Sequence, residues 1–189
     1  MKRIGILGDI GSGKTYVAKC FGYPVFNADL EVAKIYKNNK KVFLKLKKEL
    51  PLYFDSFPIK KEKIVDAILS NKQNLKKIVK IVHYEVRKKM HIFLKKNKHK
   101  KIVVLDIPLL LENKINKKKD ILIFVESKKS EILKRLKKRK NFNMEILNNF
   151  KKMQLSLVLK KKKSQFIIKN NFKKNSVKVR VKEIIKNLV

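Results

Sequence analysis

The segment "GDIGSGKT", residues 8–15, contains three of the five glycines in this 189-residue chain. The other two, Gly5 and Gly22, also lie near the start of the chain, and no glycine follows them. Glycine is needed where the backbone adopts positive φ or where a ligand approaches the main chain closely. The segment matches the pattern G-x-x-x-x-G-K-[ST], in which backbone amides surround phosphate groups. We therefore predict a phosphate-binding loop, or P-loop, over residues 8–15.

The sequence on either side of the loop supports this prediction. The apolar stretch 3–7 is typical of a buried strand, and residues 14–21 have the spacing of an amphipathic helix. In such a loop Lys14 places a positive charge at the β- and γ-phosphates of ATP, and the Thr15 hydroxyl binds Mg²⁺. The predicted ATP-binding residues of the loop are Gly8, Asp9, Ile10, Gly11, Ser12, Gly13, Lys14 and Thr15.

Short apolar strands alternate with helical patterns along the whole chain. After the first strand, further strands are expected at 24–27, 101–108, 120–126 and 165–170. This alternation predicts an α/β fold with a parallel sheet covered on both faces, a three-layer arrangement, and the P-loop at 8–15 makes it an α/β fold of the P-loop NTPase type. We expect residues 1–189 to form one domain.

Three further segments complete the predicted organisation. The glycine-free stretch 37–100 is predicted to be a helical insertion, and residues 143–157 to be one helix. The lysine runs at 117–119 and 160–163 are expected on the surface, in loops or at helix ends.

Two aspartates lie at or just after the ends of predicted strands and are candidate metal-binding or catalytic residues. Asp106 lies at the carboxyl end of "KIVVLD", within the strand expected at 101–108, where a carboxylate can hold Mg²⁺ together with the loop hydroxyl, although it could instead cap the next turn. Glu126 is a weaker candidate for the same role. Asp29 follows the strand at 24–27 and could accept a proton as a general base, or serve only as a helix N-cap. The spacing of the residues leaves both alternatives open.

The net charge of +36 comes mainly from lysine, since 46 of the 51 basic residues are lysines spread along the chain. A dedicated nucleic-acid surface more often carries arginine and aromatic residues. We interpret the lysines as a solvated surface that attracts polyanions weakly, without specific nucleic-acid binding. A basic RNA-binding protein remains an alternative at this point.

Neither a membrane span nor a disulfide is expected. No apolar run approaches the roughly 18 residues of a membrane span, and the N-terminus has no apolar signal-peptide stretch. The single cysteine, Cys20, cannot form an internal disulfide. These features favour a cytoplasmic protein, while the oligomeric state stays undetermined.

Beyond the loop, the stretches "FNADLEVAK" (26–34), "VHYEVRKKM" (82–90), "VLDIPLLLEN" (104–113) and "KKMQLSLVLKKKKSQFIIKNN" (151–171) resemble those of dephospho-CoA kinases over nearly the whole chain. The resemblance implies a P-loop kinase that uses ATP, with Mg²⁺, to phosphorylate the 3′-hydroxyl of dephospho-CoA, the last step of CoA biosynthesis. It also implies that segment 37–100 binds CoA and that residues around 138–152 form a lid. Another small alcohol or a nucleoside monophosphate is the alternative acceptor.

The resemblance also implies roles for individual residues. Asp29 matches the family's catalytic aspartate, and His83 and Arg87 match a stretch associated with the acceptor substrate. Asn170 matches an asparagine near the adenine. Arg135 and Arg139 match basic residues at the lid, and we expect them one turn apart on the same helix. Of the two, we favour Arg139 as the catalytic residue, and a surface position paired with Glu131 is the alternative.

The chain departs from the family pattern at several positions. The family usually has glycine at the position of Asp9, aspartate at that of Asn27 and proline at that of Tyr84. Ser164 and Gln165 stand where alanine and aspartate are common, and Lys169 stands where aspartate is usual. A carboxylate at position 9 is expected to weaken phosphate binding unless it points to solvent or to a lysine.

Overall fold

A computed structural model of the chain describes residues 1–139 and 142–188. The chain folds into two compact units. The first unit comprises residues 1–27, 96–143 and 150–189, and the second comprises residues 28–95 and 144–149.

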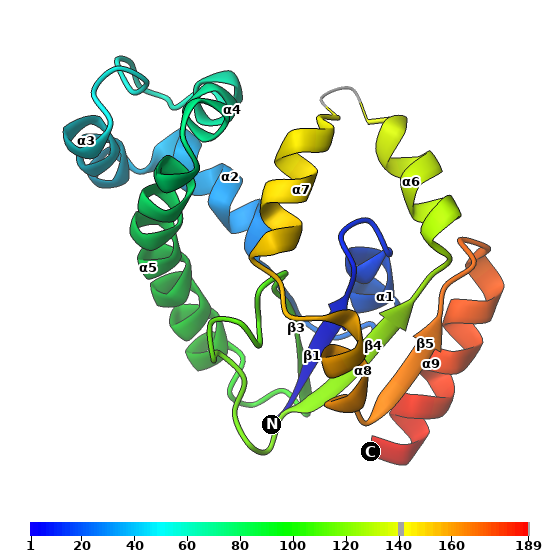
Figure 1. Ribbon diagram of the computed structural model, residues 1–189. Coiled ribbons are helices and arrows are strands. Elements are labelled where there is room, and N and C mark those ends of the chain that lie inside the picture. The colour runs from blue at the N-terminus through cyan, green and yellow to red at the C-terminus, as the bar shows by residue number, and fades with distance from the viewer. Residues whose placement is uncertain (140–141, 189) are drawn as a thin grey trace. The chain divides into compact units, whose positions relative to one another are not determined.

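The first unit is built on a five-stranded parallel sheet with the strand order β2-β3-β1-β4-β5 (Figure 1). The prediction of a parallel α/β fold is therefore confirmed. The central strand β1 is flanked by β3 and β4, so all three are buried. The strands are β1 (Lys2–Gly8), β2 (Val25–Asn27), β3 (Ile102–Asp106), β4 (Ile121–Glu126) and β5 (Phe166–Lys169).

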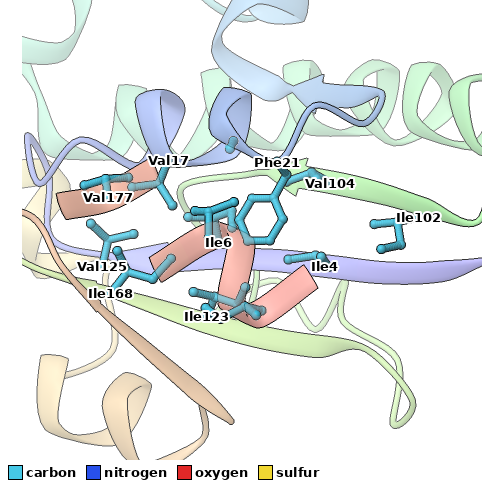
Figure 2. Packing of buried hydrophobic residues seen from close by; sticks show 13 residues of the cluster. Ile4, Ile6, Val17, Phe21, Ile102, Val104, Ile123, Val125, Ile168 and Val177 are labelled. Carbon is cyan, nitrogen blue, oxygen red and sulfur yellow. The ribbon is translucent and has the colours of Figure 1, made fainter. Parts of the chain in front are cut away.

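Helices cover both faces of this sheet. On one face α1 (Lys14–Cys20) and α9 (Lys174–Leu188) pack together around a cluster of aliphatic side chains (Figure 2). The cluster draws on alternate strand residues, such as Ile4 and Ile6, because successive side chains point to opposite faces. On the other face, α8 (Leu157–Lys162) contacts β1. Helix α6 (Lys129–Lys137) also belongs to this unit.

Gly5 of β1 is explained by packing on that second face. A Cβ atom at Gly5 would lie 2.5 Å from Cδ2 of Leu110, in the segment that follows β3. The close neighbour is thus a side chain of the protein, and the absence of a Cβ lets that segment approach the sheet. This glycine serves the fold, whereas those of the loop have the positive φ expected of a tight phosphate-binding turn.

The regular elements of the second unit, among the residues that the structure describes, are helices. Residues 37–100, predicted to be helical, contain most of its length. Its amphipathic helices pack through their apolar faces, and Asn39 caps one of them by accepting a hydrogen bond from the Val42 amide at 3.1 Å. The helices are α2 (Ala28–Asn38), α3 (Lys40–Glu49), α4 (Lys61–Ser70), α5 (Lys72–Lys96) and α7 (Met144–Lys152), the last two extending beyond the unit.

Two expectations about the C-terminal third were wrong. Residues 143–157 are not one helix, because α7 ends at Lys152 and α8 begins at Leu157, after the N-cap Ser156. The lysine run at 160–163 is not wholly on the surface either, since the Lys160 side chain is 1% exposed and paired with Glu112. Residues 140 and 141 of the predicted lid lie outside the described residues.

None of the helices in the described ranges is both long and apolar enough to cross a membrane.

Candidate functional site

In the loop between β1 and α1, the Lys14 side chain forms hydrogen bonds with two main-chain carbonyls of the same loop. The Lys14 ammonium donates to the main-chain oxygen of Asp9 at 2.8 Å and to that of Gly8 at 3.3 Å. Because α1 begins at Lys14, the positive end of the helix dipole also faces the loop. An ammonium and a helix N-terminus at the same loop make the site suited to an anion.

Two amides expected to face a phosphate are engaged within the loop. The Ile10 amide donates to the carboxylate of the neighbouring Asp9 at 2.7 Å, and the Ser12 amide donates to the Asp9 carbonyl at 3.1 Å. Of the loop amides that the motif places around phosphate, these two therefore donate within the loop in this structure. The Asp9 carboxylate points back to the loop backbone. It therefore points neither to solvent nor to a lysine, the two orientations expected to leave phosphate binding unaffected.

We predict that Asp9→Asn strengthens ATP binding. Asparagine keeps an oxygen for the Ile10 amide but removes a negative charge beside the phosphates. The affinity should rise about fivefold, since the repulsion between two unit charges about 4 Å apart in water is about 1 kcal/mol. Titration calorimetry with ATP measures this, and Asp66→Asn, on α4 of the helical unit, is a control for net charge. An unchanged affinity for Asp9→Asn would show that the carboxylate does not repel the nucleotide.

Next to the loop, Thr15 and Asp106 are brought into contact. The Thr15 hydroxyl donates to Asp106 Oδ2 at 2.6 Å, although the two residues are 91 positions apart in the sequence. Asp106 is only 3% exposed. The strand order explains the contact, because β1 and β3 are neighbours and both end at the same edge of the sheet.

Asn27 joins this pair and was not predicted as a site residue. Its side-chain amide donates to Asp106 Oδ2 at 2.5 Å and lies 3.4 Å from the Thr15 hydroxyl. Asn27 is the register partner of Asp106 at the ends of β2 and β3. The available signal was its place at the end of a strand, where it departs from the family's aspartate. Glu126, the weaker candidate, instead forms an ion pair with Lys161 at 2.6 Å.

Asp29 lies within the first turn of α2, which begins at Ala28. The alternative that Asp29 is the N-cap residue is therefore wrong, although a carboxylate in the first turn still stabilises the helix dipole. In the same unit His83 and Arg87 lie on α5, four residues apart and so on one face of that helix. Beside them the Tyr84 ring lies 4.5 Å from the Lys88 ammonium.

The two lid arginines do not share a helix. Arg135 lies on α6, but this helix ends at Lys137, so Arg139 lies two residues beyond its end. The expectation that the two arginines sit one turn apart on one helix is wrong. The Arg135 guanidinium lies over the Phe172 ring, 4.4 Å from its centroid. No ion pair joins Glu131 to either arginine within the described ranges.

Asn170, which follows β5, is buried against the back of the loop. It is 3% exposed, and its side-chain amide donates to the Ser12 carbonyl at 2.8 Å. The Ser127 hydroxyl, which follows β4, donates to the same carbonyl at 3.0 Å. Ser127 was not predicted from the sequence, because nothing in its local pattern distinguishes it from other serines.

The described residues contain no group of three His, Cys, Asp or Glu side chains that could hold a metal ion. Two oxygen groups, the Thr15 hydroxyl and the Asp106 carboxylate, do meet beside the loop. A parallel sheet with a glycine-rich loop leading into α1, a lysine over the loop and a buried aspartate on the next strand define a P-loop kinase-like nucleotide-binding protein.

Comparisons with known proteins agree with this class and narrow it. The family model described as dephospho-CoA kinase matches residues 2–176. A dephospho-CoA kinase of Wolbachia pipientis is 35% identical over 190 residues, covering 98% of this chain and 97% of the relative. One from Bartonella henselae is 30% identical, covering 100% and 99%. The chain belongs to the dephospho-CoA kinase family.

Solved structures agree on the fold. The crystal structure of a Thermus thermophilus protein superposes with a TM-score of 0.79 at 25% identity, over 100% of this chain and 98% of that one. A dephospho-CoA kinase from Campylobacter jejuni gives a TM-score of 0.64 at 22% identity, with 99% and 97% coverage.

Proposed function

We propose that the chain transfers the γ-phosphoryl group of ATP to the 3′-hydroxyl of dephospho-CoA, giving CoA and ADP. The observation that carries this proposal is the 2.6 Å contact between the Thr15 hydroxyl and the Asp106 carboxylate beside a phosphate-binding loop, in a chain of this family. A nucleotide-binding loop alone would fit many functions. The relatives that match along nearly the whole chain are dephospho-CoA kinases. They favour neither a different acceptor nor RNA binding.

The residues beside the loop fit a magnesium ion. Mg²⁺ prefers oxygen ligands and usually keeps several waters, binding through one or two protein groups and the substrate phosphates. Thr15 and Asp106 would hold it, directly or through water. When bound, such an ion would neutralise negative charge that develops on the phosphates during transfer.

The protein's own contribution is positioning and charge. Lys14 is proposed to move from the loop carbonyls onto the β- and γ-phosphates, exchanging neutral acceptors for charged ones. Asn27 holds one Asp106 oxygen, so the other stays oriented for the ion or its water. Because of this contact, the Asp106 carboxylate needs little reorganisation when the nucleotide binds.

Asp29 is the proposed general base. It lies two residues beyond Asn27, so the covalent chain keeps its Cα within about 7 Å of the Asn27 Cα. As the acceptor oxygen forms its bond to the γ-phosphorus, the bond from that phosphorus to the leaving ADP oxygen breaks and the hydroxyl proton passes to Asp29. His83 and Arg87 are proposed to bind the acceptor.

Segments 37–100 and 138–152 are proposed as the acceptor-binding insertion and the lid. Arg139 is the proposed lid residue that stabilises charge on the transferred group, because its planar guanidinium can bind two phosphoryl oxygens. Asn170 is proposed to belong to the ATP site. The reaction would take place in the cytoplasm, as proposed from the single cysteine of the chain.

The proposal is tested by measuring ADP release with a panel of acceptors. Dephospho-CoA should support turnover, whereas CoA should not, because its 3′-hydroxyl already carries phosphate. A nucleoside monophosphate and a small polyol serve as alternative acceptors. Turnover with one of these, and none with dephospho-CoA, would contradict the proposed substrate. Binding of ATP without turnover on any acceptor would contradict the proposed enzyme activity.

A further inference from the structure

One carbonyl of the phosphate-binding loop is held from outside by two side chains. The Ser12 oxygen accepts from Asn170 Nδ2 at 2.8 Å and from Ser127 Oγ at 3.0 Å. The two donors follow adjacent strands, β5 and β4, at the same edge of the sheet. A carbonyl oxygen has two lone pairs, so both are used. Ser12 itself is fully buried, which makes these bonds well shielded from water.

We propose that Asn170 and Ser127 are positioning residues that aim the Gly13 amide at the phosphates of the bound nucleotide. A trans peptide is planar, and its C=O and N–H point in opposite directions. Fixing the Ser12 carbonyl on the outer side therefore fixes the next N–H, that of Gly13, toward the inner side of the loop. Within residues 1–139 and 142–188, the Gly13 amide donates to no protein acceptor, so it is available to a ligand.

The backbone at Gly13 supports this role. Gly13 has φ +92°, and a Cβ atom there would lie 2.3 Å from Asn170 Nδ2. The Asn170 amide thus packs directly on the loop backbone, and only glycine leaves room for it. Any larger residue would separate the loop from its support and would also be strained at this φ.

The orientation of Asn170 is itself fixed. Its backbone amide donates to the Glu126 carbonyl at 2.7 Å, and its Oδ1 accepts from the Phe172 amide at 2.9 Å. Since Oδ1 faces a donor, Nδ2 is the atom that faces the Ser12 oxygen. This network locks the side chain in place, as a positioning role requires.

The inference rests on the proposed nucleotide site but makes a different assignment from the one that the resemblance gave to Asn170. A residue that contacts the adenine affects only ligands that carry a base. A residue that acts through the Gly13 amide affects every ligand that carries the phosphates, including one without a base.

The experiment compares ATP with inorganic tripolyphosphate, both as magnesium complexes, on Ser127→Ala, Asn170→Ala and the double variant. Titration at an ionic strength of about 0.5 M suppresses diffuse binding to the lysine-rich surface, because the Debye length there is about 4 Å. Ser164→Ala is the matched control, since its hydroxyl also donates to a buried backbone carbonyl, that of Lys160, at 2.9 Å. Thermal unfolding checks that each variant is folded.

We expect each single variant to bind both ligands about twofold to tenfold more weakly, as for the loss of one neutral hydrogen bond. The double variant should lose more than either single variant, and Ser164→Ala should bind as the unchanged protein does. Loss of affinity for ATP but not for tripolyphosphate would overturn the proposal and place Asn170 at the base. Unchanged binding of both ligands by a folded Ser127→Ala would overturn it as well, even if Asn170→Ala fails to fold. Neither titration requires dephospho-CoA or turnover, so failure of the proposed activity is detected separately.

Discussion

Replacing Lys160 with alanine is expected to lower the free energy of unfolding by about 3–5 kcal/mol, the cost of leaving one member of a buried ion pair without its partner. Lys160 Nζ lies 2.8 Å from Glu112 Oε1, and the two side chains are 1% and 9% exposed. The ammonium also donates to Gln154 Oε1 at 3.2 Å. Glu112 Oε1 additionally accepts from the Leu155 amide at 2.9 Å, whereas its buried Oε2 has no hydrogen-bond partner in the described ranges.

Without Lys160, the Glu112 carboxylate would keep one amide donor and no cation. In a domain of this size the loss corresponds to a fall in Tm of about 6–20 °C, which thermal unfolding measures. A double variant, Lys160→Met with Glu112→Leu, should recover most of the loss, because an apolar pair of similar volume avoids the buried charge.

The next lysine provides a matched control. Lys161 is on the same helix and pairs with Glu126 at 2.6 Å, but these side chains are 44% and 36% exposed. Lys161→Ala should therefore change stability by at most about 1 kcal/mol. Equal effects of the two substitutions would show that burial of the Lys160 pair contributes nothing to stability.

Replacing Asp29 with asparagine is expected to lower kcat about 10²–10⁴-fold, the usual contribution of a general base. Asparagine has nearly the same shape but cannot accept the proton of the attacking hydroxyl. The affinity for ATP should stay nearly unchanged, because the proposed role concerns the acceptor. Steady-state kinetics with dephospho-CoA, together with ATP titration, separates the two quantities.

Glu31 is the control for a purely structural role of Asp29. Both are acidic residues in the first turn of α2 and both stabilise its dipole, which is worth about 0.3–1 kcal/mol for each charge. Glu31→Gln should therefore lower stability slightly and leave kcat unchanged. If Asp29→Asn also keeps its full kcat, Asp29 stabilises the helix and takes no part in the reaction.

The scarcity of arginine in this chain does not by itself identify a functional residue. A planar guanidinium can bind two phosphoryl oxygens, which is the reason to propose a function for Arg139. Arg3 shows that the same fork serves the fold, since its Nη2 lies 2.9 Å from Asp120 Oδ2 and 3.2 Å from the Ile115 carbonyl in a buried site. Burial, which the sequence does not state, decides between the two uses.

The sequence by itself determined the features that depend on neighbours along the chain. The loop at 8–15 follows from its glycines and its Lys14, because positive φ and the turn into α1 are local properties. The strands and most helices follow from apolar periodicity, which reflects one buried face. The break between α7 and α8 was missed because the helical pattern continues beyond Lys152, where α7 ends, and the N-cap Ser156 that precedes α8 was not recognised as the start of a new helix.

Only the tertiary structure decided which distant groups meet. The strand order β2-β3-β1-β4-β5 brings Asn27 and Thr15 to Asp106, and places Asn170 on the carbonyl of Ser12, 158 residues away in the sequence. It likewise decided that one lysine of a run of four is buried while the next is exposed. These contacts depend on which strand ends lie side by side and on how a helix face meets the sheet. Neither is encoded in local spacing, because a carbonyl or a carboxylate gains its partners only when the whole sheet has formed.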